Sequence, residues 1–312
     1  MLIKKISLLQ IIGGLGAAIT LIVFVISPSF PTPDKIIIFL TFVFMMFSQA
    51  KAMLARLLPF VGLLLVYESF RGIADYLNSN VNYELPAHVD KAIFGTLPTV
   101  SLQQWWWQGS VGLLDLIFYL VYLLHFILPV GLAIIIWKTK ERFYWRFVTS
   151  FLVVSFMGFI TFVLFPAAPP WMSSELGYIE PIERISSEVW NVLGLSDFPT
   201  VYDSISPNPV AAVPSLHAAW AALLSILVFK IYGRRWGAAS LLYPALIFVG
   251  TVYQGEHYVF DIFVGVFYAA IAYWLTPRLL RWLGRWYRGS GNRLRLLVKR
   301  VESAFTQPEH SQ

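Results

Sequence analysis

Long apolar segments separated by short polar ones make up most of this chain. A transmembrane helix needs about 20 mostly apolar residues. Eight segments reach or approach this length, at residues 6–26, 36–54, 57–77, 111–137, 143–165, 215–231, 236–253 and 257–276. The second is the least regular, because its apolar run is short and Lys51 lies inside it. The pattern predicts an all-α, polytopic helical membrane protein with about eight transmembrane spans.

The composition is that of a membrane protein. Apolar residues make up 58% of the 312 positions and charged residues only 13%, whereas about a quarter of the residues in a soluble domain are charged. The mean hydropathy is +0.67. Cysteine is absent, which excludes disulfide frameworks, thiolate nucleophiles and thiolate-bound metals.

Basic residues gather on one side of the predicted spans. Cytoplasmic loops of membrane proteins are enriched in Lys and Arg. With eight spans and a cytoplasmic N-terminus, all but four of the 23 Lys and Arg residues fall in cytoplasmic segments, the exceptions being Lys35, Arg71, Lys91 and Arg184. The sequence therefore predicts a multi-pass cell membrane protein with both termini in the cytoplasm. Topology then explains the net charge of +6, and we expect no nucleic-acid partner.

The predicted spans divide the chain into three parts. Two N-terminal spans occupy residues 1–56, a six-span catalytic core occupies 57–276, and a basic amphipathic cytoplasmic tail occupies 277–312. In the tail, Arg side chains recur at helical spacing among Leu and Trp, which predicts a helix on the anionic lipids of the inner leaflet, unless the charges only fix the topology. Of the two long outer segments, 78–110 and 166–208, the second has the composition of a lid.

Few ionisable residues lie within the predicted spans, where each of them is costly. They are Glu68, Arg71, Asp75, Asp115, His125, His217, His257 and Asp261. In the predicted orientation, all except His125 lie in the outer half of their helices. This coincidence predicts an active site that faces the extracytoplasmic (or lumenal) side.

The segment Val213-Pro214-Ser215-Leu216-His217 begins a predicted span. Proline suits the first turn of a helix, where a missing N–H group costs nothing. The free N–H groups of Ser215, Leu216 and His217 would then point outward, and such a helix N-terminus binds phosphate readily. A histidine in this turn can protonate a leaving oxygen. The structural alternative is a capped helix whose histidine only meets a carbonyl group.

His257 and Asp261 lie four residues apart at the start of the last predicted span. Residues at this spacing share a helix face, so Asp261 can accept a hydrogen bond from one ring nitrogen of His257. The other nitrogen is then available as a base or a nucleophile. The same pair would also suit zinc, if His217 or acids of the third span completed the site, or a structural contact in a helix bundle.

The two segments together, Pro-Ser-x-His and then His-x-x-x-Asp one helical hairpin later, resemble two signature motifs of the type 2 phosphatidic acid phosphatase superfamily. In that superfamily the later histidine attacks phosphorus, the aspartate orients it, and the earlier histidine donates and accepts the proton. The resemblance implies these catalytic roles for His257, Asp261 and His217, respectively. It also implies a phosphohistidine intermediate, with no cofactor and no metal.

Two phosphate-binding cations that are usual in the superfamily have no counterpart here. The chain contains no Arg-Pro pair, which the first motif requires, and Gly250 and Thr251 occupy the Ser-Arg positions of the third motif. The inositol phosphorylceramide synthase branch departs in a similar way. The chain resembles that branch in Phe-Pro-Ala-Ala-Pro-Pro-Trp at 165–171 and Pro-Ser-Leu-His-Ala-Ala-Trp at 214–220. This resemblance implies an inositolphosphotransferase.

These features predict an integral membrane phosphotransferase that moves a phospho-alcohol head group, phosphoinositol, between donor and acceptor membrane lipids in sphingolipid metabolism. A lipid phosphate or pyrophosphate phosphatase of the same superfamily is the first alternative, because water can replace the acceptor alcohol. A membrane transporter or scaffold is the second, because intramembrane charges also suit a transport path. Inverted repeats and broken helices, which are typical of transporters, are not evident in the sequence.

Arg71 is the only cation in an outer half-span. We therefore expect it to bind the substrate phosphate, together with the N–H groups of Ser215 and Leu216. Glu68 and Asp75 lie three and four residues from Arg71 on a face that it can reach. One of these acids would either orient the guanidinium or neutralise it.

Other polar residues have structural and functional interpretations. Asp115, Tyr119 and Tyr122 lie on one stripe of the fourth span, where they would bind inositol hydroxyls or join helices through hydrogen bonds. His125 is predicted to be a satisfied core histidine, too deep for the outer site. Trp171 and the prolines around it are expected to shape a rigid outer loop.

Overall fold

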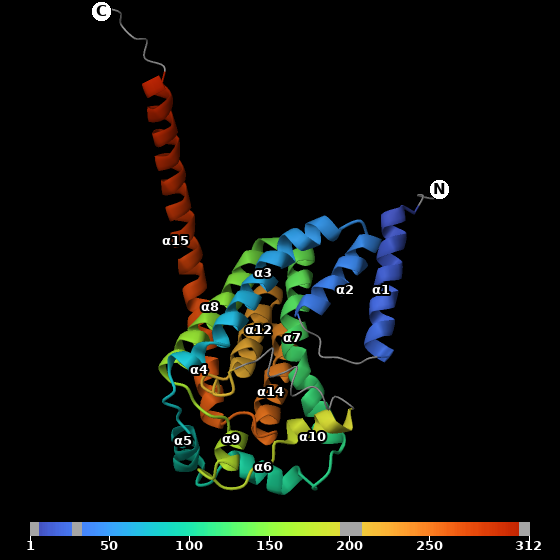
Figure 1. The fold of residues 1–312 in the computed structure, drawn as a ribbon, viewed down its shortest axis with the longest axis vertical. Helices are drawn as coiled ribbons and strands as arrows, with labels where there is room; N and C mark the ends of the chain where they lie inside the picture. The colour runs from blue at the N-terminus through green and yellow to red at the C-terminus, as the bar shows by residue number, and fades with distance from the viewer. Residues whose placement is uncertain (1–5, 27–32, 194–207, 306–312) are drawn as a thin grey trace, which may run out of the picture.

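The computed structural model describes residues 6–26, 33–193 and 208–305, and the regular elements in these residues are helices (Figure 1). Two N-terminal helices pack on each other and on the rest of the bundle: α1 (Leu8–Ile26) and α2 (Pro33–Met46). The other long elements are α3 (Ala50–Arg71), α7 (Leu113–Thr139), α8 (Tyr144–Leu164), α12 (Leu216–Tyr232), α14 (Leu242–Tyr253) and α15 (Val259–Phe305). The short ones are α4 (Ala74–Leu77), α5 (Leu85–Phe94), α6 (Pro98–Trp106), η1 (Glu141–Phe143), α9 (Pro170–Glu175), α10 (Ile185–Val192) and α13 (Arg234–Ser240).

The predicted class, an all-α polytopic membrane protein, is confirmed, but the number of about eight spans is not. In the described residues, six helices are long and apolar enough to cross a membrane: Leu8–Ile26, Ala50–Arg71, Leu113–Thr139, Glu141–Leu164, Arg234–Tyr253 and Val259–Trp286. The other two predicted spans correspond to shorter apolar helices, Ile36–Met46 and Leu216–Tyr232. A helix of 17 residues is about 26 Å long, which is less than the roughly 30 Å of a bilayer core.

The short helix α12 forms the centre of the bundle. Most of its side chains are buried, and it packs against α7, α8, α14 and α15. Four of the buried residues are alanines, which allow neighbouring helices to approach closely. The indole N–H of Trp220 donates to the hydroxyl of Ser155 in α8, at 3.1 Å. Because other helices rather than lipid surround α12, its first turn can lie inside the bundle.

Helices α12 and α15 approach each other closely near their first turns. A Cβ atom added to Gly265 of α15 would lie 2.4 Å from the carbonyl oxygen of Ser215, so only glycine fits there. Near this contact, the N–H group of Ser215 donates to the carbonyl oxygen of Asp261 at 3.0 Å. The first turns of α12 and α15 are therefore fixed to each other by main-chain atoms.

The outer segments form a helical cap at one end of the bundle. Helices α5, α6, α9 and α10 gather there, opposite the N-terminal end of α1 and the C-terminal end of α15 (Figure 1). The side-chain amide of Gln103 in α6 joins the cap to the bundle, because it donates to the carbonyl oxygens of Glu183 and Tyr253 at 2.8 and 2.9 Å. The predicted lid contains α9 and α10, and its residues 194–207 lie outside the described part of the chain.

The last helix continues beyond the predicted last span. It runs from Val259 through Pro277 to Phe305, so the predicted cytoplasmic tail begins as a continuation of a transmembrane helix. The guanidinium of Arg278 lies 3.5 Å from the centre of the Trp274 ring. Tryptophan and arginine at the end of a span are typical of a membrane interface.

We predict that Gly265→Ala destabilises the protein by about 1–3 kcal/mol, because the new methyl group forces α15 away from the backbone of α12. Gly62→Ala is the matched control: it is also a helical glycine, and a Cβ atom there meets nothing within 4 Å. Thermal unfolding in detergent micelles measures the stability of both variants. Equal unfolding temperatures for the two variants would contradict the assigned close approach.

Candidate active site

His257 lies in the turn between α14 and α15 and is not inside a helix. Gly255 has a φ of 78°, a backbone conformation that favours glycine, and it lets the chain reverse direction after α14. The N–H groups of Glu256 and His257 both donate to the carbonyl oxygen of Thr251, at 3.0 and 3.1 Å. The main chain therefore fixes the position of the histidine before α15 begins.

The predicted contact between His257 and Asp261 is present. The Nδ1 atom of His257 lies 3.2 Å from Oδ2 of Asp261, and this oxygen also accepts a hydrogen bond from the N–H group of Tyr258 at 2.9 Å. The contact does not come from a shared helix face, because His257 precedes α15; the carboxylate instead reaches back from the first helical turn. Both residues are buried. The carboxylate fixes the imidazole through Nδ1, so Nε2 is the ring nitrogen left for contacts with other groups.

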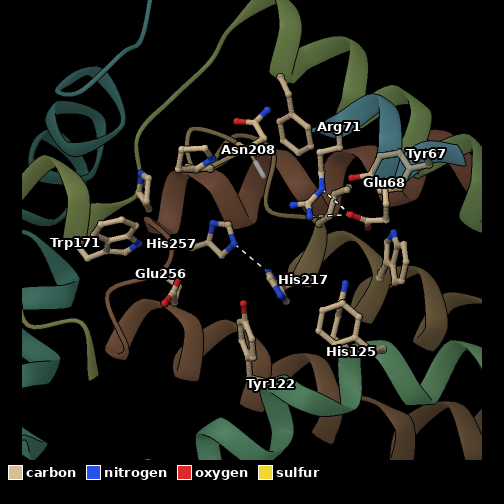
Figure 2. Close-up of a pocket in the computed structure, with 18 of the residues that line it drawn as sticks. Tyr67, Glu68, Arg71, Tyr122, His125, Trp171, Asn208, His217, Glu256 and His257 are labelled. Atoms are coloured by element: carbon tan, nitrogen blue, oxygen red, sulfur yellow. Dashed lines mark hydrogen bonds and ion pairs between the residues drawn. The ribbon is translucent and has the colours of Figure 1, made fainter. Parts of the chain in front are cut away.

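The two predicted catalytic histidines are adjacent. The Nδ1 atom of His217 lies 3.2 Å from the Nε2 atom of His257 (Figure 2). Asp261, His257 and His217 therefore form a continuous polar chain. The Nε2 atom of His217 is buried and has no hydrogen-bond partner in the described part of the chain. For a phosphorus atom beside Nε2 of His257, His217 would be a neighbouring proton donor.

The start of α12 differs from the expected phosphate site. Ser215 is its N-cap, and the Ser215 N–H group donates to the carbonyl oxygen of Asp261. The expectation that this N–H group is free for phosphate is therefore wrong, because it joins two helices. Pro214 precedes the cap and does not occupy the first turn. The N–H groups of Leu216 and His217 begin the helix and have no acceptor in a preceding turn, so they stay candidate phosphate donors.

A cavity of about 140 Å³ opens beside the two histidines. Its walls come from α3, α7 and α12, from the turn before α15, and from the segment between α8 and α12 (Figure 2). That segment contributes Trp171 and Asn208. The N–H group of Trp171 also donates to the carbonyl oxygen of Gly255, at 3.1 Å. Trp171, which was expected to shape a rigid outer loop, therefore also forms part of the cavity wall next to His257.

Arg71 lies on the cavity wall, as expected for a phosphate ligand. Its Nε and Nη2 atoms lie 2.9 and 2.7 Å from Oε2 of Glu68. Of the two acids expected near Arg71, Glu68 is therefore the one that orients the guanidinium. Asp75 instead accepts a hydrogen bond from the N–H group of Tyr76. Both Arg71 and Glu68 line the cavity, so the pair presents a cation and an anion to a substrate.

A second arginine in the cavity was not predicted from the sequence. Arg184, at the start of α10, lies 3.0 Å from Oε1 of Glu256, and its guanidinium is 4.1 Å from the centre of the Trp171 ring. The hydroxyl of Ser186 also donates to Glu256. The only signals in the sequence were that Glu256 precedes His257 and that Arg184 departs from the positive-inside pattern. Neither signal shows that the two residues meet.

The prediction that His125 is a satisfied core histidine is wrong. His125 lines the cavity, and its ring centre lies 4.4 Å from that of His217. Its Nδ1 atom is buried without a hydrogen-bond partner in the described residues. The depth argument failed because α12 is short: its first turn begins beside the middle of α7, which places His217 at the depth of His125.

The three polar residues on the stripe of α7 have different positions. The ring of Tyr122 stacks on that of His217 at 4.4 Å and lines the cavity. Asp115 accepts hydrogen bonds from the Tyr253 hydroxyl at 2.5 Å and from the N–H group of Gly112 at 2.7 Å, so it joins helices. Tyr119 stacks on Tyr122 and is not part of the cavity wall. Only Tyr122 is therefore placed to contact a substrate.

Asp90 caps the helix that carries Asp261, a role that the sequence did not indicate. Its two carboxylate oxygens accept hydrogen bonds from the N–H groups of Val259 and Phe260, at 2.8 and 2.9 Å. Asp90 belongs to α5 and is 1% exposed. Burial raises the pKa of its carboxyl group to about 6. The cap helix α5 therefore holds the first turn of α15 in place.

The spacing of His257 and Asp261 in the sequence was also compatible with a zinc site. In the described residues, no group of three or more His, Asp and Glu side chains is arranged to hold a metal ion. His217 faces His257 through a ring nitrogen at 3.2 Å, which is a hydrogen-bond distance between the two rings. The residues of the site therefore do not form a zinc site of three protein ligands.

The site and fold belong to a known class of membrane enzymes. The PAP2 superfamily model matches residues 88–275, which is more than half of the chain. The chain therefore belongs to the PAP2 superfamily, as the motifs predicted, and is a PAP2-like enzyme, a transferase or a phosphatase acting on lipid phosphates. The chain is similar to the phosphoinositol dihydroceramide synthase of Bacteroides thetaiotaomicron, with 30% identity over 234 residues that cover 70% of this chain and 74% of that protein. No solved structure matches the chain significantly.

We predict that the stability of the protein depends on the ionisation of Asp90. The folded pKa is above the unfolded value, so the contribution of Asp90 is fully present below about pH 4 and is lost as the pH rises through about 6. Asp90→Asn removes this component and should flatten the fall in unfolding temperature between about pH 4 and 6. The control is Asp75→Asn, which removes a carboxyl group that does not cap α15. Parallel profiles for wild type and Asp90→Asn would contradict the assignment.

Proposed function

We propose that this chain is an inositolphosphotransferase, which moves phosphoinositol from a donor phospholipid to the hydroxyl group of an acceptor lipid of the ceramide type. The observation that carries the proposal is the chain of contacts from Asp261 through His257 to His217, at 3.2 Å for each step. The name of the similar bacterial protein, a phosphoinositol dihydroceramide synthase, supports the choice of head group and acceptor.

In the first step, the Nε2 atom of His257 attacks the phosphorus of the donor phosphodiester. A phosphorus–nitrogen bond forms, and the bond from phosphorus to the diacylglycerol oxygen breaks. The Asp261 carboxylate stabilises the positive charge that develops on the imidazole through its contact with Nδ1. His217 gives its proton to the departing diacylglycerol oxygen. The head group is then held on the enzyme as a phosphohistidine.

In the second step, the acceptor alcohol takes the place of diacylglycerol. His217, now neutral, removes the proton from the acceptor hydroxyl as the oxygen attacks phosphorus. The phosphorus–nitrogen bond breaks, and His257 returns to its neutral form. The proton that His217 gave in the first step is thereby recovered, so the cycle consumes no net acid or base.

Positive groups around the two histidines would stabilise the pentacoordinate phosphorus. Arg71 lies on the cavity wall, and Glu68 holds its guanidinium in one orientation. The N–H groups of Leu216 and His217 add the positive end of the α12 dipole. Arg184 brings a second cation to the same cavity, although the Ser-Arg pair of the third motif is absent. Fixed donors of this kind act more strongly in an enclosed site than in water.

We further propose that the cap end of the bundle faces the extracytoplasmic (or lumenal) side and that both termini are cytoplasmic. The N-terminal end of α1 and the C-terminal end of α15 lie at the opposite end from the cap (Figure 1). The distribution of Lys and Arg supports the same orientation. The basic part of α15 that begins near Arg278 would then contact anionic lipids of the inner leaflet.

The assay for this function follows a labelled head group. Purified protein receives phosphatidylinositol labelled in the inositol ring, with or without ceramide. We expect the label to move to a new lipid only when ceramide is present, because the acceptor hydroxyl must discharge the phosphohistidine. Water-soluble inositol phosphate that appears at the same rate with and without ceramide would instead assign the chain to the phosphatases of the superfamily.

We predict that His257→Ala and His217→Ala reduce transfer on the order of a thousandfold or more, because each removes a group that bonds to reacting atoms. Asp261→Asn should reduce it about a hundredfold or more, because the amide cannot stabilise the imidazolium. The control is His88→Ala, which removes an exposed histidine outside the cavity. Near wild-type transfer by folded His257→Ala protein would refute the nucleophile assignment.

A further inference from the structure

Three residues that line the cavity each have a buried polar side-chain atom with no hydrogen-bond partner in the described residues. These atoms are Nδ1 of His125, Nε2 of His217 and Nδ2 of Asn208. A buried polar atom that stays unpaired costs about 1–3 kcal/mol, and native proteins contain few of them. Three such atoms around one cavity indicate that a polar ligand forms the missing hydrogen bonds. Because His217 handles the proton of the reaction, the other two are left for another part of the substrate.

The unpaired part of the Asn208 amide is a hydrogen-bond donor. Its Oδ1 atom accepts a hydrogen bond from the N–H group of Val210 at 3.0 Å, which fixes the amide orientation. Its NH₂ group is therefore the unpaired part. Asn208 is 4% exposed, so bulk water does not satisfy this group. This second observation, from another segment of the chain, supports a ligand with hydrogen-bonding oxygens.

The position of His125 separates it from the phosphorus. Its ring is packed between those of Trp220 and His217, each with a centre-to-centre distance of 4.4 Å, and His217 lies between it and His257 (Figure 2). A substrate atom at Nδ1 of His125 therefore belongs to a group attached to phosphorus. Drug-sized ligands occupy pockets of about 300–1,000 Å³, so a cavity of about 140 Å³ takes a lipid head group and not acyl chains.

We propose that His125 binds a hydroxyl group of the lipid head group and thereby selects polyol head groups over quaternary ammonium ones. This inference rests on the proposed head-group transfer and names the residue that gives it specificity. An imidazole nitrogen can donate to a hydroxyl or accept from it, whereas a choline group can do neither. Choline sites use open aromatic faces. Here the guanidinium of Arg184 lies over the ring of Trp171, and the ring of His217 stacks on that of Tyr122.

Binding of soluble head-group analogues tests this inference without turnover. We expect wild-type protein in detergent to bind myo-inositol 1-phosphate at least about tenfold more tightly than phosphocholine, which corresponds to one hydrogen bond that only the polyol makes. Isothermal titration calorimetry measures both, with inorganic phosphate as the reference for the phosphate-binding groups. Equal affinity of the wild type for the two esters would overturn the proposal.

Two nearly isosteric variants separate the hydrogen bond from the packing. His125→Leu removes the polar atom and should bring the affinity for inositol phosphate down about tenfold, toward that for phosphocholine, with phosphate affinity unchanged. His125→Asn keeps a polar atom near the position of Nδ1 and should retain most of the preference. An unchanged preference in folded His125→Leu protein, or an equal loss for all three ligands, would contradict the assigned role.

Tyr119→Phe is the matched control, because it deletes a buried hydroxyl of the same helix that is not on the cavity wall. It should bind all three ligands as the wild type does. The test also separates this inference from the proposed function. A wild-type protein that prefers inositol phosphate but transfers no head group would refute only the transfer reaction. One that transfers the head group without this preference would refute only the role of His125.

Discussion

One main-chain hydrogen bond holds the candidate catalytic groups together. The N–H group of Ser215 donates to the carbonyl oxygen of Asp261, and Gly265 lets the backbones of α12 and α15 come close enough for this bond to form. His217 follows two residues after the donor, and His257 precedes the acceptor by four. Their 3.2 Å contact is therefore a consequence of how two helices begin, rather than of flexible side chains finding each other.

The membrane imposes a second constraint on the site, because charges within it must be balanced. Arg71 pairs with Glu68, and Arg184 pairs with Glu256, so the cavity wall carries two cations and two anions. The acids orient the guanidinium groups while they reduce the cost of placing them in an apolar bundle. In the proposed reaction, the phosphodiester of a lipid would meet cations that are already positioned. Among the described residues, no Lys or Arg side chain pairs with the buried Asp261, which instead contacts His257 and accepts a hydrogen bond from the N–H group of Tyr258.

The sequence predicted the parts of this structure that depend on local patterns. Hydropathy indicated the membrane helices, and the two motifs indicated His217, His257 and Asp261 together with the superfamily. The number of spans could not be predicted reliably, because apolar length does not show that α12 starts inside the bundle. His125 was misjudged, and Arg184 was not predicted as part of the site. Their proximity to the histidines depends on how distant segments pack, and no spacing in the chain records that packing.

The central claim is that His257 carries the head group between two lipids. Protein incubated with phosphatidylinositol labelled in the inositol ring, without an acceptor alcohol, is denatured at alkaline pH, which preserves phosphohistidine, and its peptides are analysed by mass spectrometry. The account predicts a single inositol phosphate adduct on His257. Label on His217, or steady transfer between lipids with no covalent adduct on the protein, would contradict it.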